Sequence, residues 1–327
     1  MVHFGPNPVP DTRAGEIYEI SHGRASILFV LLAGIGISFL YRSARRNQAV
    51  LGRAQILTRA AILLPLGLWL QGLDHGVLVI LQFYAMYFAF AAILVGFSNR
   101  VLLVAGIAFL ALGPVAYEAA EVRWPAWFAD HAPELGDPID KIARDLLISG
   151  YYPLITWAAP LTIGMWFGRQ RLSSLSFKWG MVAIGAVLTA ASSLIAEAAS
   201  GSQFAIVLSN DPHSQNHLWM IGAIGSAMLV LGLALLVSDV SGRTLWPLAA
   251  AGQLALTIYV GHLLLLDSYT DLLRYDTVRG AAYSVALFTT FAIVASTLWR
   301  MVFAHGPLEA VFRAPSWIFN QFAGDKR

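Results

Sequence analysis

The amino-acid sequence predicts an all-α protein that crosses a membrane as a bundle of helices. Hydrophobic residues make up 57% of the 327-residue chain, charged residues make up only 12%, and the mean hydropathy is +0.65. A soluble domain carries about 25% charged residues, so this chain has too few to cover a soluble surface. Apolar runs of about 20 residues recur along the chain, and this is the length of a helix that crosses the hydrocarbon core of a bilayer.

Nine segments have the length and composition of membrane-spanning helices. They lie near residues 24–42, 55–73, 77–97, 100–117, 150–168, 177–199, 218–238, 246–266 and 280–303. Barrel strands do not fit, because these runs are too long for strands and because a helix satisfies each backbone amide within lipid. Little length remains outside the spans, so we expect one integral-membrane domain over residues 1–327.

The basic residues of the loops predict which side of the membrane each loop faces. One set of alternate loops holds 14 of the 21 lysines and arginines, and the other set holds seven. Loops rich in these residues face the cytoplasm, so the N-terminus is predicted outside and the C-terminus inside. The larger set comprises Arg42, Arg45, Arg46, Arg53, Arg59, Arg100, Arg169, Arg171, Lys178, Arg243, Arg300, Arg313, Lys326 and Arg327. The net charge of +2 gives no reason to expect a nucleic-acid partner.

The longest outer segment, residues 118–149, has the composition of a loop on the membrane surface. Trp124 and Trp127 are of the type enriched at membrane–water interfaces. Residues 137–148 carry apolar side chains at helical spacing, which predicts a short surface helix there.

Under this topology, seven of the eight histidines lie outside or near the outer membrane boundary. Histidine changes charge near neutral pH, so their gathering favours chemistry on the outer side. The alternative is that histidine simply tolerates an interface. The seven are His3, His22, His75, His131, His213, His217 and His262.

Few polar residues lie within the predicted spans, and each is a candidate for function. Gln82 lies in the third span, and Tyr259 and His262 lie in the eighth. Tyr259 and His262 are three residues apart and share a helix face, so the phenol could orient the imidazole. A polar residue inside a membrane marks a functional site or makes a hydrogen bond between packed helices, and both alternatives stay open here.

His213 and His217 have the i, i+4 spacing of paired metal ligands on a helix. No third ligand accompanies them, and Pro212 indicates a loop that leads into a helix. We therefore expect no metal at these residues. A polar wall of an outward-facing site and a solvated loop are the two remaining interpretations. The chain has no cysteine, which excludes disulfides and a thiolate nucleophile.

Arg24 stands beside His22 at the outer start of the first span. Its guanidinium could reach lipid headgroups, hold an anionic group of a substrate, or pair with an upstream glutamate. On the inner side, Arg42, Arg45 and Arg46 could anchor anionic lipid or attract a nucleotide such as coenzyme A. The glycines at 34 and 36, and at 164 and 168, predict close packing between helices.

Short motifs along nearly the whole chain resemble one family of membrane proteins in their order. They are HGRASILF at 22–29 with LAGI at 32–35, ILQFYAMYF at 80–88, YPL at 152–154 with Trp157, GMWFGR at 164–169, DPHS at 211–214, LTIYVGH at 256–262 and GPLE at 306–309. The ordered set resembles the YeiB-like and heparan-α-glucosaminide N-acetyltransferase-like membrane proteins. That family pattern begins with an additional span, and residues 1–6 look like its outer end. His3 resembles the family histidine, but without that helix we expect it not to be held in place.

The resemblance implies a transmembrane acyltransferase in the bacterial cytoplasmic (inner) membrane. Such an enzyme moves an acyl group, with acetyl as our expectation, from cytoplasmic acyl-coenzyme A to a sugar, lipid or glycan acceptor outside. Acyl transfer needs a base for the acceptor and a donor for the developing oxyanion. We expect His262 or His3 as the base, and Arg45, Arg46 and Arg169 near the acyl-coenzyme A. The residues expected to bind the acyl group and the acceptor are Arg24, His22, Gln82, Tyr259, His213 and His217.

Other classes of function are compatible with the same polar residues. A transporter or flippase of a lipid-linked or acidic metabolite is the main alternative, although no inverted repeat is visible. A membrane scaffold that forms a homodimer through helix faces with GxxxG spacing is a further alternative. This function would account for the glycines but not for the polar residues within the spans. A channel is disfavoured because no ring of pore charges stands out. Membrane lipids are expected partners in every case.

Overall fold

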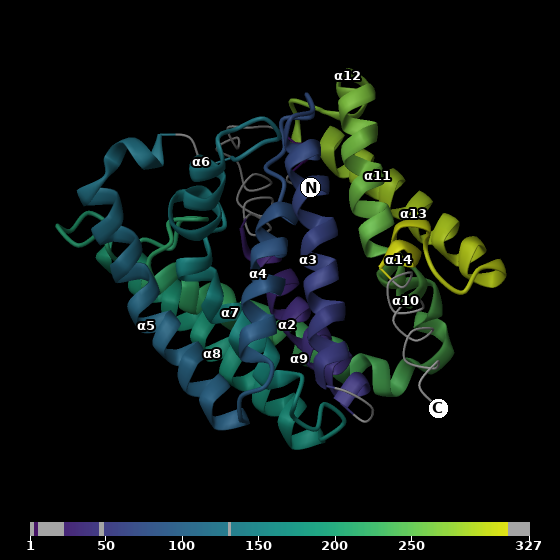
Figure 1. The fold of residues 1–327 in the computed structure, drawn as a ribbon, viewed down its shortest axis with the longest axis horizontal. Coiled ribbons are helices and arrows are strands. Elements are labelled where there is room, and N and C mark those ends of the chain that lie inside the picture. Colours follow the sequence, from purple (N-terminus) through teal and green to yellow (C-terminus); the bar gives the residue numbers. More distant parts are fainter. Residues whose placement is uncertain (1–2, 6–22, 46–48, 130–131, 313–327) are drawn as a thin grey trace. The chain divides into compact units, whose positions relative to one another are not determined.

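The computed structural model describes residues 3–5, 23–45, 49–129 and 132–312 of the chain. These residues form helices joined by turns and contain no strand, which confirms the predicted all-α class (Figure 1). The long helices are α2 (Arg24–Arg45), α3 (Ala49–Gln71), α4 (Leu81–Leu94), α5 (Asn99–Arg123), α7 (Leu154–Phe167), α8 (Leu175–Ala199), α9 (His217–Ser241), α11 (Ala255–Ser268) and α13 (Val278–Val302). The short ones include η1 (Pro125–Phe128), α6 (Ile139–Arg144), the π-turn η2 (Asp145–Ser149), α10 (Trp246–Gln253), α12 (Thr270–Leu273) and α14 (Pro307–Val311).

Each of the nine predicted spans contains a helix, but the helices differ in length. Within the described part of the chain, six are long and apolar enough to cross a membrane. A seventh span results if α6 with η2 and α7, which bend by 59° at their junction, are one broken helix. α4 and α11 are apolar but shorter. The protein is thus an integral membrane protein, while the count of nine and the sidedness stay predictions.

Two of the predicted segments are shorter or more interrupted than their composition suggests. The third begins only at Leu81, because residues 76–80 do not form a helix. The eighth is divided at Leu254, which lies between the end of α10 and the start of α11. Its φ of −109° and ψ of 23° are not those of an α-helix. The predicted surface helix of residues 137–148 is present as α6 and η2.

The described chain divides into two compact units. The large unit comprises residues 23–71 and 78–237, and the small unit comprises the described residues before 23 together with 72–77 and 238–312. The division does not follow the predicted single domain of residues 1–327, which stays a prediction. Each unit is described separately below.

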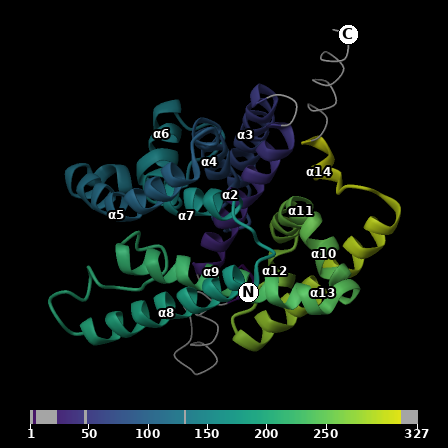
Figure 2. The ribbon, with the colours of Figure 1, turned by 90° about the horizontal axis from the view of Figure 1, so that it is seen from below.

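In the large unit, α2 packs closely against α7 because glycines remove side chains from the contact (Figure 2). A Cβ on Gly164 would lie 2.2 Å from the Leu31 carbonyl oxygen, and one on Gly34 would lie 2.3 Å from that of Leu161. Gly168 packs on Ile35 in the same way. The packing predicted from these glycines is confirmed. Gly36 differs, since nothing described lies within 4 Å of its Cβ position.

In the small unit, α14 caps the start of α11. The Glu309 carboxylate accepts hydrogen bonds from the backbone N–H groups of Leu256 and Thr257, at 2.8 and 3.0 Å. It also accepts one from the Thr257 hydroxyl at 2.6 Å. The first N–H groups of a helix have no partner within the helix, and the helix dipole favours a negative charge there. Glu309 therefore fixes the end of the helix that carries Tyr259 and His262.

Candidate active site

The small unit brings His3 and His262 into direct contact. His3 Nδ1 lies 2.9 Å from His262 Nε2, although the two residues are 259 positions apart. The imidazole rings are almost parallel, with an interplanar angle of 6° and centroids 5.1 Å apart. A hydrogen bond between two imidazoles needs one ring to donate and the other to accept, so at least one of them is neutral.

Neighbouring residues hold both rings. The Tyr259 ring packs edge-on against the His262 ring, and the two ring centroids are 5.1 Å apart. This contact follows from their positions on one face of the helix. Phe4 packs on Phe288 of α13, and the Phe4 carbonyl accepts a hydrogen bond from Tyr275 N at 3.1 Å.

The expectation that His3 is not held in place is wrong. The contacts of His3 with His262 and of Phe4 with α13 fix residues 3 and 4 against the small unit. Burial, with smaller contributions from positive charge on His262, His75 and Arg274, lowers the pKa of His3 to about 3. His3 is therefore neutral at pH 7 and free to accept a proton, although the same shift makes it a weaker base than an ordinary histidine.

A second polar group in the small unit lies around His75. The Arg274 guanidinium donates to the His75 carbonyl at 2.6 Å, and Val77 N donates to the His75 ring at 3.0 Å. His75 is 1% exposed. The bond from Val77 satisfies one ring nitrogen of this buried side chain, which sequence reasoning placed only among the outer histidines.

In the large unit, Gln82 is fully buried on α4 against α3. Neither its amide oxygen nor its amide nitrogen has a hydrogen-bond partner among the described residues. Gly67 makes room for it, since a Cβ there would lie 2.7 Å from Gln82 Oε1. A buried amide without partners costs free energy, so Gln82 has bonding capacity that a polar substrate group could use.

His213 lies in the turn before α9 among four aromatic rings. Their centroids lie 4.7 to 6.2 Å from its own, and they belong to Tyr151, Tyr152, Trp157 and Trp219. His217 is the first residue of α9, and its Nε2 lies 2.9 Å from the Ala111 carbonyl oxygen of α5. His213 has a φ of 63° and lies outside the helix, so the two do not share a helix face as a metal pair would.

Sequence reasoning missed Gln215, which ties this turn to α7. Its Oε1 accepts hydrogen bonds from the Thr156 hydroxyl at 2.7 Å and from Trp157 Nε1 at 3.0 Å, and its Nε2 donates to the Tyr151 carbonyl at 3.1 Å. The available signal was the presence of Thr156 and Trp157 in an otherwise apolar span, since both need a polar partner when buried.

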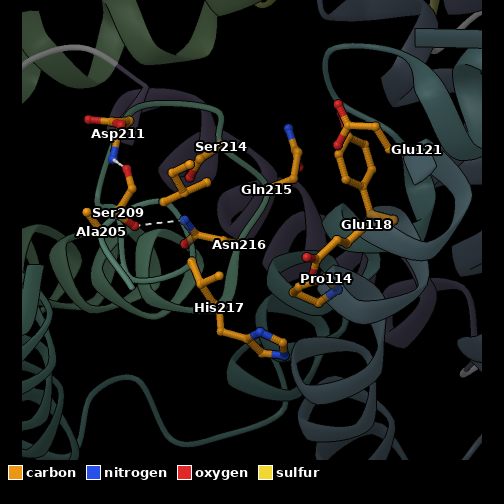
Figure 3. A pocket seen from close by; sticks show the side chains of 13 residues that line it. Pro114, Glu118, Glu121, Ala205, Ser209, Asp211, Ser214, Gln215, Asn216 and His217 are labelled. Carbon is orange, nitrogen blue, oxygen red and sulfur yellow. Dashed lines mark hydrogen bonds between the residues drawn. The ribbon is translucent and has the colours of Figure 1, made fainter. Parts of the chain in front are cut away.

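An acidic cavity of about 460 Å³ lies in the large unit between α5 and the segment before α9 (Figure 3). Glu118 and Glu121 line it from α5, and Asp211 and Ser214 line it from the other side. Asn216 also lines it and is oriented by a hydrogen bond from its side chain to the Ser209 carbonyl at 2.8 Å. Carboxylates and an amide in one cavity suit a ligand with several hydroxyl or ammonium donors.

The remaining predicted residues lie apart from these sites or outside the described residues. Arg24 is half-buried and is the first residue of α2. His22 and Arg46 fall outside the described residues, and Arg45 is described only as part of α2. Arg169 donates to the Val95 and Phe97 carbonyls at 2.8 and 2.5 Å, and so holds the turn that follows α4.

Comparison with protein families matches residues 77–305 to the acyltransferase domain family (Acyl_transf_3). The match covers more than two thirds of the chain and includes residues of both units. The protein belongs to this family and is therefore a membrane protein of an acyltransferase class. His262, Gln82, His213, His217, Tyr259 and Arg169 lie within the matched residues. Neither the curated proteins nor the solved structures include a match.

Proposed function

We propose that this protein transfers an acetyl group from cytoplasmic acetyl-coenzyme A to an acceptor on the outer side of the membrane. Within the acyltransferase family, its motifs favour a relative of the YeiB-like and heparan-α-glucosaminide N-acetyltransferase-like proteins. The observation that carries the proposal is the contact of His3 with His262, because it supplies a neutral imidazole in a chain of an acyltransferase family. The bacterial inner membrane is the proposed location.

The histidine pair acts as base and orienting group in this proposal. In this arrangement His3 Nδ1–H donates to His262 Nε2. The second nitrogen of His3 then carries the free lone pair. It takes the proton of the acceptor hydroxyl or amine, whose oxygen or nitrogen attacks the thioester carbonyl. The carbon–sulfur bond breaks, the acyl group stays on the acceptor, and His3 returns its proton to the coenzyme A thiolate, which leaves as the thiol.

The other predicted residues have supporting roles in the proposal. Gln82, whose buried amide has no hydrogen-bond partner among the described residues, binds a polar group of a substrate. Arg24, His22, Tyr259, His213 and His217 contribute to binding the acyl group and acceptor. Arg45, Arg46 and Arg169 are the residues proposed to bind acyl-coenzyme A. No metal takes part in these steps.

The test is a transfer assay in sealed membrane vesicles of defined orientation. Acetyl-coenzyme A with a labelled acetyl group is added to inside-out and to right-side-out vesicles that contain the protein. The proposal predicts label in lipid or glycan only when the cytoplasmic face meets the donor. Equal transfer from either face would contradict the sidedness. No transfer, together with uptake of an acidic or lipid-linked metabolite, would favour a transporter instead.

A further inference from the structure

An apolar groove of about 220 Å³ runs along the small unit between α11 and α13. Thr257, Gly261 and His262 line it from α11, and Phe291 and Ala292 line it from α13. His262 is thus shared between the groove and the histidine pair. The groove therefore borders the imidazole that contacts His3, the proposed base.

The lining of the groove determines what kind of molecule fits in it. None of the 13 residues that line it is charged. The hydroxyl of Thr257 is bonded to Glu309, and the ring of His262 is bonded to His3. Ser296 adds one further hydroxyl to the lining, so a charged or strongly polar group would lose its hydration here for few partners, whereas a hydrocarbon chain would lose nothing.

The groove is also open to the surroundings of α13. Phe291 is 64% exposed and Leu265 of α11 is 38% exposed. α13 is one of the helices long and apolar enough to span the membrane. A side opening on a spanning helix faces bilayer hydrocarbon, so a lipid chain reaches the groove without passing through water.

We propose that this groove holds one hydrocarbon chain of a membrane lipid that serves as the acceptor. The proposal rests on the proposed acyl transfer, and it selects a lipid from the sugar, lipid or glycan acceptors. A lipid chain seated beside His262 places its polar headgroup, with the hydroxyl or amine to be acylated, next to the histidine pair. The groove, of about 220 Å³, accommodates part of such a chain.

Gly261 keeps the groove open and decides whether a chain fits. Nothing described lies within 4 Å of the Cβ position of Gly261, so a larger side chain enters the groove rather than striking the protein. The chain gains no hydrophobic free energy on leaving the bilayer, because the lipid around it is equally apolar. The shape of the groove therefore determines whether a lipid chain occupies it. A side chain at position 261 would fill the same space as the lipid chain.

The experiment is photo-crosslinking of the full chain in proteoliposomes. The probe is a diacylglycerol with a diazirine near the end of one acyl chain, since it offers both a hydrocarbon chain and a free hydroxyl. We expect the label on residues of α11 and α13 that line the groove. Gly261→Phe should reduce this labelling about tenfold, and Gly261→Ala should reduce it less.

The matched control is Gly252→Phe. Gly252 is an exposed glycine of α10 with nothing described within 4 Å of its Cβ position, and it does not line the groove. Gly252→Phe should keep labelling within twofold of the unmodified protein. Equal labelling of the Gly261→Phe variant would overturn the proposal, as would label spread evenly over the outer face of α13.

A second arm separates the acceptor from the donor. Octanoyl-coenzyme A with a diazirine at the end of its chain is used in place of the lipid. If it labels the groove and the diacylglycerol does not, the groove belongs to the donor and the proposal is wrong. Crosslinking needs no turnover, so Gly261-dependent labelling without acetyl transfer would show a lipid-binding groove but refute both the proposed function and the acceptor role of the lipid. Transfer without Gly261-dependent labelling would refute the groove alone.

Discussion

Two histidines of this protein, His262 and His213, are alike in sequence context but differ in their surroundings. Each lies near a predicted outer membrane boundary, in a motif of the same family pattern. His262 meets a second imidazole at hydrogen-bond distance, whereas His213 is enclosed by four aromatic rings. An imidazole pair can pass or accept a proton. A ring packed among aromatic side chains mainly fixes the turn that carries it. The comparison predicts that replacing each has a different effect.

The largest effect is expected on catalysis at His262. His262→Gln should reduce the rate of acetyl transfer by about 10²–10³-fold, because general-base catalysis contributes about 10²–10⁴-fold. The melting temperature should change little. Transfer by purified protein in proteoliposomes measures the rate. His305→Gln, at a histidine outside the family motifs, serves as the control and should keep full activity.

His213→Ala tests whether His213 contributes to stability more than to catalysis. It removes a ring from an aromatic cluster, so we expect a loss of about 2 kcal/mol in stability and a decrease in rate below tenfold. Thermal unfolding in detergent and the transfer assay are measured on the same preparation. A rate loss as large as that of His262→Gln, with an unchanged melting temperature, would show that His213 takes part in catalysis. The proposed difference between the two histidines would then be wrong.

Gln215→Ala should also act through stability. It leaves Trp157 Nε1 and the Thr156 hydroxyl buried without their acceptor, at a cost of about 2–3 kcal/mol. Gln203→Ala, at an exposed glutamine of the same segment, is the matched control. Equal melting temperatures for the two variants would show that Gln215 does not hold the turn.

Glu309→Gln sharpens the comparison by testing how α11 is positioned. The substitution removes the negative charge that caps the helix, and we expect a loss of about 1 kcal/mol because the amide oxygen can still accept the two backbone N–H groups that bond to one carboxylate oxygen. Thermal unfolding measures it, with Glu134→Gln as an exposed control. Destabilisation no greater than that of the control would mean that the cap does not hold α11.

The smallest effect is expected from pH. His3 has a pKa lowered to about 3, so its neutral form persists as pH falls and is lost only near that value. The transfer rate should therefore change less than twofold between pH 7.5 and 5. A base with the ordinary histidine pKa of about 6.5 would lose most of its neutral form over this range. A tenfold fall centred near pH 6.5 would show that the working imidazole is not buried as His3 is.

The sequence predicts the helices well, because apolar runs and helix-packing glycines are local features. Gly34 and Gly164 pack between α2 and α7 as expected. The break at Leu254 was not predicted, since the apolar run continues through it and only the backbone angles reveal it. The late start of α4 at Leu81 was not predicted either. Residues 76–80 are as apolar as a membrane-spanning helix, so their composition does not show that they are not helical.

The candidate site was predicted only in part. His3 and His262 were each recognised as candidate bases, but their contact joins residues 259 positions apart and no local spacing encodes it. Gln82 was recognised because a polar residue in an apolar helix is conspicuous. Gln215 was missed because its role depends on two residues of a different helix, Thr156 and Trp157.

The most direct test of the histidine pair is a double-substitution cycle. The rate of acetyl transfer is measured for His3→Gln, His262→Gln and the variant with both changes, in proteoliposomes supplied with acetyl-coenzyme A. If the two imidazoles act as one unit, the double variant is no slower than the slower single variant, because either change alone disables the pair. Rate losses that multiply, or a single substitution that leaves the rate unchanged, would contradict the account.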